Sequence, residues 1–166
     1  LAEALEEFTG VHRRFEIKGE TNGIMVIDDY GHHPAEVRAT IGAIRDSWKR
    51  PLTVIFQPHR YTRTRDLFDE FLTAFEGADR LILTEIYAAG EDAIAGTSGE
   101  TLYQAIKRQG HIDVEYVPDQ NRIAGSVAAK LKPGDIALTL GAGDIYKVGD
   151  ALVEALKEAS ENGVLE

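Results

Sequence analysis

The sequence predicts an α/β fold, namely a Rossmann-like three-layer domain with about six strands in a mostly parallel sheet and an antiparallel hairpin at one edge. Short apolar runs alternate with helical patterns of ten or more residues, and such alternation requires right-handed crossovers between parallel strands. An Asn22-Gly23 pair separates the first two strand-like segments, as in a tight hairpin. The length of 166 residues fits one domain.

The first third of the chain predicts the hairpin and one helix. Residues 14–18 alternate Phe15 and Ile17 with charged residues, and residues 24–27 form an apolar run after the turn. Pro34 suits the first position of a helix, and apolar residues then recur at spacings of four, three and four. These apolar residues are Val37, Ile41, Ile44 and Trp48.

The same alternation continues to the end of the chain. Strands are predicted at residues 52–56, 80–85, 114–117 and 136–140. Helices are predicted around the apolar residues of 67–75, from a capping box at Thr97 and Glu100, and over 121–131 and 145–157. Residues 1–8 resemble a helix end and 9–13 a connection. We therefore divide the chain into 1–13, the tail of a preceding domain with its linker, a domain over 14–158, and a C-terminal tail over 159–166.

Composition excludes several classes of function. Eighteen basic and 28 acidic side chains give a net charge of -10, which opposes binding to nucleic acid. No apolar run approaches the roughly 18 residues of a membrane span, and the first ten residues lack the basic leader of a signal peptide. The absence of cysteine excludes disulfides and thiolate metal sites. We expect a cytoplasmic protein that binds no membrane.

The predicted strand ends collect the chemically active residues, and ligands of open parallel sheets bind beyond the carboxyl ends of the strands. After residues 24–27 come two carboxylates, a phenol and two imidazoles, a set that suits a ligand with hydroxyl groups or a carboxylate. They are Asp28, Asp29, Tyr30, His32 and His33. The alternative is that an Asp and a His only cap the helix at Pro34. We favour the functional interpretation, because titratable groups cluster at sites.

Residues 57–65 form an electropositive patch in an acidic protein. If a helix starts near Thr62, its first amides together with Arg60 and Arg63 would converge on one anion. The alternative, an exposed arginine face that pairs with Asp66 and Asp69, has equal weight at this point.

Two later strand ends are less specific. The segment 85–90 ends in a glycine, and 141–144 is Gly-Ala-Gly-Asp, a poor dinucleotide fingerprint because Tyr146 occupies the third glycine position. A tight turn is the favoured interpretation. A phosphorylation-receiver domain would need an Asp at Glu85 and a Lys at Gly141, so that class is excluded.

A metal site is disfavoured. Candidate ligands exist, but adjacent histidines seldom point the same way and no His-x-x-x-His pair is present. The candidates are Asp28, Asp29, His32, His33 and His59.

Four segments, taken in order, resemble the Mur ligase family. They are DDYGHHP at 28–34, FQPHRYTRTRD at 56–66, EIYAAGE at 85–91 and GAGDI at 141–145. The resemblance runs from about Phe8 to Lys157, and its first two motifs are specific. Within the family the chain is most similar to the alanine-adding ligases. The murein tripeptide recycling ligases, which share the first motif in altered form, are the alternative.

The resemblance implies a three-domain enzyme of peptidoglycan synthesis that uses ATP to join L-alanine to UDP-N-acetylmuramate through an acyl phosphate. The chain has no Gly-x-x-x-x-Gly-Lys-Ser/Thr loop. It would therefore be the C-terminal domain, which contacts the amino acid and ATP, docks on its own N-terminal and central domains, and is inactive alone. Mg²⁺ would be held mainly by the central domain.

The resemblance also implies residue roles, position by position. Asp29 resembles the acid that binds the ATP ribose, and Arg14 an arginine that reaches ATP when the domains close. The L-alanine pocket is assigned to Tyr30, His32, Arg60 and Arg63, with guanidinium groups holding the carboxylate. No catalytic residue and no metal ligand is assigned. We expect the acids and arginines on neighbouring strand ends. The rival hypothesis is a stand-alone Rossmann-type module that binds a nucleotide or an acidic metabolite.

Overall fold

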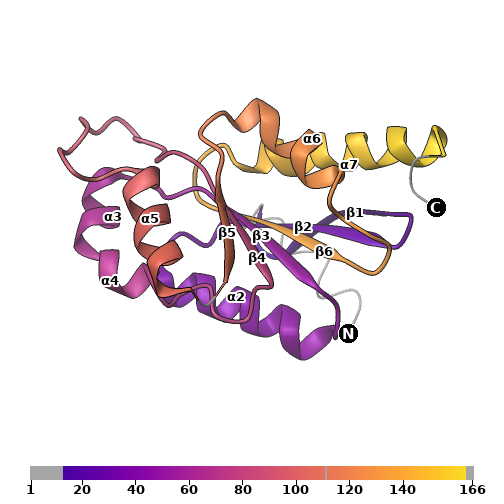
Figure 1. The fold of residues 1–166 in the computed structure, drawn as a ribbon, viewed down its shortest axis with the longest axis horizontal. Helices are drawn as coiled ribbons and strands as arrows, with labels where there is room; N and C mark the ends of the chain where they lie inside the picture. The colour runs from indigo at the N-terminus through magenta and orange to yellow at the C-terminus, as the bar shows by residue number, and fades with distance from the viewer. Residues whose placement is uncertain (1–12, 111, 164–166) are drawn as a thin grey trace, which may run out of the picture.

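A computed structural model describes residues 13–110 and 112–163 of the chain. One six-stranded sheet lies between two layers of helices (Figure 1), which confirms the predicted fold class. The strand order is β1-β2-β6-β3-β4-β5; β1 is antiparallel to β2, and all other pairs are parallel. No helix in the described part of the chain is long and apolar enough to cross a membrane.

The element bounds follow the predicted alternation. The strands are β1 (Glu16–Thr21), β2 (Ile24–Asp29), β3 (Leu52–Phe56), β4 (Arg80–Leu83), β5 (Asp113–Tyr116) and β6 (Ile136–Leu140). The helices are α2 (Pro34–Ser47), α3 (Tyr61–Asp66), α4 (Phe68–Phe71), α5 (Gly99–Gln109), the 3-10 helix η1 (Gln120–Arg122), α6 (Ile123–Ala128) and α7 (Tyr146–Glu161). The expected helix end over 1–8 and the connection up to residue 12 lie outside the described residues, and the domain division stays a prediction.

The hairpin β1–β2 closes through the predicted turn. Asn22 and Gly23 have φ values of 51° and 75°, and two successive positive φ values are those of a type I′ turn. Strand β2 is longer than predicted: Asp28 and Asp29 belong to it and pair with Thr139 and Leu140 of β6. The two carboxylates are therefore placed by sheet register and not by the following turn.

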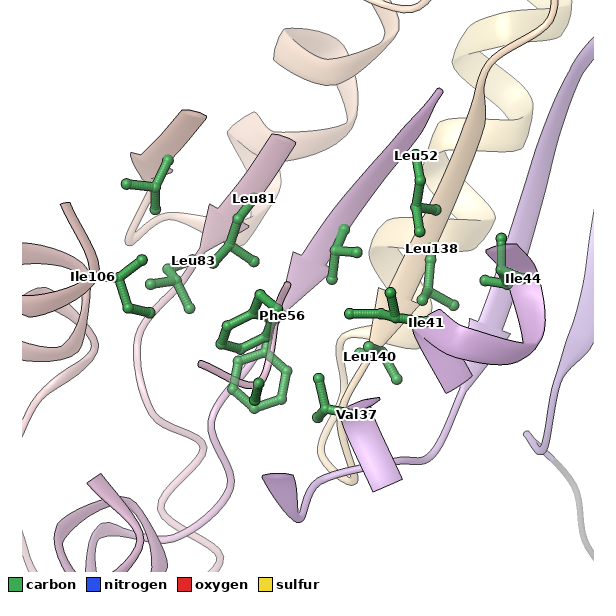
Figure 2. Packing of buried hydrophobic residues seen from close by; sticks show 14 of the residues in the cluster. Val37, Ile41, Ile44, Leu52, Phe56, Leu81, Leu83, Ile106, Leu138 and Leu140 are labelled. Carbon is green, nitrogen blue, oxygen red and sulfur yellow. The ribbon is translucent and has the colours of Figure 1, made fainter. Parts of the chain in front are cut away.

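Two apolar clusters fill the spaces on either side of the sheet. Helices α2, α4 and α5 cover one face, and α6 and α7 cover the other, seen above the sheet in Figure 1. Val37, Ile41 and Ile44 of α2 point at Leu138 and Leu140 of β6 in Figure 2, and all five side chains are buried. The predicted helical spacing thus identifies the buried face of α2.

Three helix predictions need correction. The apolar residues of 67–75 do not share one helix, because α4 covers only Phe68–Phe71. Leu67 (φ -108°, ψ 19°) precedes it, and Leu72 and Phe75 follow it in turns. The capping box before α5 is formed by Ser98 and Thr101 and not by Thr97 and Glu100. The segment expected as one helix over 121–131 is the 3-10 helix η1 followed by α6, which ends at Ala128.

The position of β6 decides where the loops of the sheet diverge. β6 lies between β2 and β3. Helix α7 follows β6 on one face of the sheet, whereas α2, which follows β2, and α3, which follows β3, lie on the other face (Figure 1). Open α/β sheets bind ligands where successive connections part in this way. The carboxyl ends of β2, β6 and β3 are therefore the place to look for a site.

Candidate functional site

The three strand ends are joined directly to one another. The Gly141 amide after β6 donates to the Asp29 carbonyl at 3.2 Å, and the Gln57 amide after β3 donates to the Leu140 carbonyl at 3.0 Å. The expectation that the acids and the arginines lie on adjacent strands is wrong in one respect, because β6 separates β2 from β3. The segments that follow β2 and β3 nevertheless meet above β6, where the rings of His32 and His59 are 5.8 Å apart.

We call the carboxyl ends of β2, β6 and β3, with the segments that follow them, the rim. Asp29 links three parts of it. Its carboxylate accepts hydrogen bonds from the Gly31 amide at 2.8 Å, the Thr40 hydroxyl at 3.2 Å and the Phe15 amide at 2.8 Å. These bonds connect the turn after β2, helix α2 and the start of the described chain. Oδ2 takes only one of the three donors, so it retains room for one more hydrogen bond.

The two adjacent histidines have different tasks. His33 is the N-cap of α2: its Nδ1 accepts from the Ala35 amide at 3.2 Å, and Glu36 accepts from the His32 and His33 amides at 3.0 Å each. The capping interpretation is therefore correct for His33. The His32 ring turns to the rim, where it contacts Tyr30 edge-on at 5.3 Å and faces His59. In the part of the chain that the structure describes, no three His, Cys, Asp or Glu side chains form a metal-binding group.

Arg60 stands at the start of α3 in a strained conformation. Its φ is 72°, rare for a residue with a side chain and typical of functional loops. The backbone is held by a bond from its amide to the Tyr87 carbonyl at 2.8 Å, and its carbonyl accepts from the Thr64 hydroxyl at 2.9 Å. Among the described residues, the exposed Arg60 guanidinium makes no hydrogen bond or ion pair. The alternative pairing with Asp66 belongs to Arg65, at 2.8 Å.

Arg63 fixes the protonation of His59. One guanidinium nitrogen, Nη1, lies 3.1 Å from both the Nδ1 and the carbonyl oxygen of His59. Arginine can only donate, so Nδ1 accepts and the ring proton is on Nε2. Burial, the charge of Arg63, and His32 and Arg60 nearby lower the pKa of His59 to about 4. His59 is therefore a neutral ring among cations.

The anionic group at the start of α3 is the carboxylate of Glu91, a residue of the same chain. Glu91 accepts from the Thr62 amide at 3.0 Å and from the Thr62 hydroxyl at 2.6 Å. These bonds hold the pKa of Glu91 below its ordinary value. The Thr62 amide, expected to face a bound anion, is thus satisfied by Glu91, whereas the Arg60 guanidinium remains available.

A row of four rings crosses the rim from β2 to β4. Beyond the Tyr30–His32 and His32–His59 contacts, His59 stacks on Tyr87 with centroids 5.5 Å apart and planes at 9°. Gly143 backs the last ring, since a Cβ there would lie 2.6 Å from Tyr87 Cγ. The sequence contained Tyr87 within a motif, but nothing in its spacing indicated that it stacks on His59.

Arg13 is a structural residue of the rim that sequence reasoning missed. Its guanidinium donates to Asp28 Oδ2 and to the carbonyls of Gly141 and Gly143, each at 2.9 Å. It also lies over the rings of Tyr30 and Tyr146. The basic pair Arg13-Arg14 was the sequence signal that could have drawn attention to this residue. In the structure, the Arg13 side chain points into the rim.

Arg14 faces the other way. It is exposed and lines a small pocket of about 150 Å³ together with Asp29, Tyr30, Glu36 and Thr40. The two residues assigned to ATP therefore share one pocket, on the side of Tyr30 that carries the start of α2.

Two acids on the rim have structural partners. Glu85 accepts from the Ile86 and Gly99 amides at 2.8 Å and from the Tyr116 hydroxyl at 2.7 Å, so it caps α5. Asp144 accepts from the side-chain amides of Gln57 and Gln120 at 3.0 Å each. Burial alone would raise the pKa of Asp144, but these two bonds, together with a backbone hydrogen bond and the charge of Lys147, keep the pKa below the ordinary value.

Comparison with known proteins identifies the family of the chain. The family model described as Mur ligase, glutamate ligase domain, matches residues 13–143. The chain belongs to the Mur ligase family. The match includes Arg13 and Arg14, every element from β1 to β6, and the loop up to Gly143.

Similar proteins within the Mur ligase family carry specific names. A UDP-N-acetylmuramate–L-alanine ligase from Geotalea daltonii is 55% identical over 154 residues, which are 93% of this chain and 34% of the relative. The crystal structure of UDP-N-acetylmuramate-alanine ligase from Thermotoga maritima has a TM-score of 0.75 at 31% identity, over 95% of this chain and 33% of that one. This Mur ligase domain spans about a third of the length of these relatives.

A murein peptide ligase from Psychrobacter arcticus shares the fold. Its TM-score is 0.71 at 24% identity, over 93% of this chain and 32% of that one. At this identity the likeness concerns the fold alone.

Proposed function

We propose that this Mur ligase domain is the C-terminal domain of the ligase that joins L-alanine to UDP-N-acetylmuramate with ATP, in peptidoglycan precursor synthesis. The observation that carries the proposal is the Arg60 guanidinium, which is exposed and unpaired among the described residues and belongs to the residue after His59, whose ring lies 5.8 Å from that of His32. A carboxylate is the ligand that an arginine binds with two parallel hydrogen bonds.

The amino-acid pocket lies between the segments after β2 and β3. Tyr30 and His32 form one wall, and Arg60 and Arg63 the other. The guanidinium groups of Arg60 and Arg63 hold the alanine carboxylate, and Arg63 also holds the His59 ring. Because these groups are positioned before the substrate arrives, little ordering is left to oppose binding. The domain thereby presents the alanine amine to the activated sugar, and such positioning accounts for much of the rate of a bimolecular reaction.

ATP contacts the pocket beside Tyr30. The residues there fit a nucleotide in two respects: Arg14 is an exposed cation, and Asp29 Oδ2 has room for a ribose hydroxyl. ATP supplies the phosphoryl group that activates the carboxylate of UDP-N-acetylmuramate. We place Mg²⁺ mainly on ligands of the central domain, outside this chain.

The remaining partners are the N-terminal and central domains of the same enzyme, onto which this domain docks. The 166 residues contain no phosphate-binding loop, so the domain contributes to a site that other domains complete. We place the reaction in the cytoplasm, where ATP is supplied.

The test is a pair of substitutions in the full-length enzyme. Arg60→Ala and Arg63→Ala should each raise the KM for L-alanine about 10- to 150-fold and leave the KM for UDP-N-acetylmuramate nearly unchanged, because each removes a charge-assisted contact worth about 1.5–3 kcal/mol. Steady-state ADP release measures both constants. Arg65→Ala is the matched control: Arg65 is exposed on the same helix, is paired with Asp66, and should leave both constants unchanged.

Equal effects on both substrates would contradict the carboxylate clamp. Activity with a murein tripeptide in place of L-alanine would instead assign the chain to a recycling ligase. Sub-millimolar nucleotide binding by the isolated chain, measured by titration calorimetry, would favour the stand-alone module.

A further inference from the structure

Helix α3 receives its N-terminal cap from another loop. Arg60, at the N-cap position, makes no capping hydrogen bond with its side chain. Glu91 fills that place, since its two carboxylate oxygens accept from the amide and the hydroxyl of Thr62. The cap therefore depends on a residue 29 positions further along the chain.

The backbone between β4 and Glu91 is shaped for this contact. Ala89 and Gly90 have φ values of 51° and 83°, so the chain turns sharply, and the Glu91 amide bonds to the Ala88 carbonyl at 3.0 Å. Before this turn, the Tyr87 amide donates to the Pro58 carbonyl at 2.8 Å, and the Tyr87 carbonyl accepts from Arg60. The loop therefore holds the backbone on both sides of the Arg60 side chain: Tyr87 bonds to the Arg60 amide, and Glu91 bonds to Thr62.

We propose that Glu91 is a positioning residue of the amino-acid pocket: its carboxylate holds the first turn of α3, with Arg60 and Arg63, in the binding geometry before the amino acid arrives. The inference rests on the proposed function and adds a residue to it. Without the cap, the short helix would exchange between this and other conformations, and a pocket that is formed only part of the time binds in proportion to that fraction.

The opposite role, a carboxylate that competes with the substrate, is disfavoured by the contacts. A competitor would sit on the guanidinium groups of Arg60 or Arg63. Both Glu91 oxygens instead bond to Thr62, and no ion pair joins Glu91 to either arginine in the described chain. The two roles also predict opposite changes in KM.

The experiment uses the full-length ligase that contains this domain. Glu91→Gln keeps the shape of the side chain, removes its charge and leaves one acceptor oxygen instead of two, so it weakens the cap without abolishing it. It should raise the KM for L-alanine about 3- to 10-fold, within the equilibrium cost of losing a helix N-cap. The KM for UDP-N-acetylmuramate and the kcat at saturating alanine should stay within about twofold. Asp92→Asn is the matched control, because it removes the same charge from the next residue of the loop, which makes no hydrogen bond or ion pair among the described residues.

Thr62 supplies a conservative rescue. Thr62→Ser keeps the hydroxyl and should retain the wild-type KM, whereas Thr62→Val should raise it as Glu91→Gln does. Hydrogen exchange of the peptide covering 57–67 in the same full-length protein should be faster in Glu91→Gln and Thr62→Val than in Asp92→Asn. This readout follows the cap itself, with or without substrate.

Three results would overturn the proposal. A lower KM in Glu91→Gln would identify a competitor, unchanged kinetic constants would make the cap irrelevant to binding, and unchanged hydrogen exchange would show that Glu91 does not hold α3. Wild-type enzyme that shows no dependence on alanine would overturn the proposed function itself. An alanine-dependent wild type with unchanged Glu91→Gln constants would overturn the role of Glu91 alone.

Discussion

At the residue scale, His59 shows how the rim keeps a ring neutral. Its Nδ1 accepts from Arg63, its face lies against Tyr87, and His32 is in contact on the other side. A proton on Nδ1 would point at a guanidinium hydrogen, so protonation has to break the Arg63 contact as well as charge a partly buried ring. Both effects act against the imidazolium.

We expect the pKa of His59 to lie near 4 in the folded chain, against about 6.5 for an ordinary histidine. A pH titration of the imidazole signals by NMR measures it, and the tautomer should be the one with the proton on Nε2. In Arg63→Met, which keeps bulk and removes charge, the pKa should rise toward 6.5. A wild-type midpoint near 6.5 would contradict the arrangement.

The sign of the stability effect follows from the same shift. Because the folded-state pKa is depressed, the contribution of His59 to the free energy of unfolding is fully present above pH 6.5, and it is lost as the pH falls from 6.5 through about 4. The Arg63→Met chain should lose less stability over this window than the wild type.

Side-chain direction is what the sequence could not supply at this scale. The pairs Arg13-Arg14 and His32-His33 are both conspicuous in the sequence. In each pair one residue supports the structure, namely Arg13 and His33, and the other, Arg14 or His32, faces the candidate site. Consecutive residues in irregular backbone leave in different directions, and only the φ and ψ values of the loop decide which one points inward. The resemblance to a family chose Arg14 and His32, whereas periodicity could not.

At the scale of elements, the junction between β4 and α5 is the tightest backbone contact near the rim. A Cβ on Gly99 would lie 2.3 Å from the Thr84 carbonyl oxygen, and the Gly99 amide bonds to Glu85. The start of α5 therefore lies directly against the end of β4. This close approach explains why the helix begins at Gly99 after the Ser98 cap, one residue later than the predicted cap at Thr97.

Gly99→Ala should destabilise the chain by about 1–3 kcal/mol, because the methyl group has no room and the helix must shift. Gly42→Ala is the matched control: it makes the same change in the interior of α2, where a Cβ meets nothing within 4 Å, and it should stabilise by about 0.5–1 kcal/mol. Urea unfolding of both variants measures the difference. Equal stabilisation of both variants would show that helix propensity, and not the contact with Thr84, governs Gly99.

The elements that the sequence predicted best are the ones buried on both faces. Strands β3 and β6 have the predicted bounds of 52–56 and 136–140, because a buried parallel strand is a continuous apolar run with polar residues at its ends. The helix expected around 67–75 failed for the opposite reason. Its apolar residues follow a helical spacing, but the backbone leaves the helix at Leu67 and again after Phe71, and the rings of Phe71 and Phe75 both contact Phe56.

At the scale of the whole molecule, the last strand in sequence completes the site. β6 inserts between β2 and β3, so the loop at 141–144 becomes the centre of the rim. Alternating strands and helices predict a parallel sheet but not the order of its strands, and the acids and arginines were accordingly expected on neighbouring strand ends. The register that results puts Asp28 next to Thr139 of β6 and within reach of Arg13.

Arg13 joins the start of the described chain to the end of β2 and to the loop after β6. Its removal should therefore lower the free energy of unfolding of the whole domain. Arg13→Met would leave the fully buried Asp28 with one remaining donor, the Thr139 hydroxyl at 2.6 Å. A buried charge without its partner costs about 3–5 kcal/mol, and we expect the lower end, since the Arg13 side chain is 16% exposed. Urea unfolding of the chain measures the loss.

The double variant separates charge pairing from packing. Arg13→Met with Asp28→Asn should recover about 1–3 kcal/mol relative to the sum of the two single changes, because a neutral amide no longer needs the guanidinium. Strict additivity would mean that Arg13 acts through its bonds to the Gly141 and Gly143 carbonyls and not through Asp28. In that case Arg13 would hold the loop after β6 in place, and not the end of β2. In either case the m-value of urea unfolding should be the same in all three variants, because they expose the same surface when they unfold.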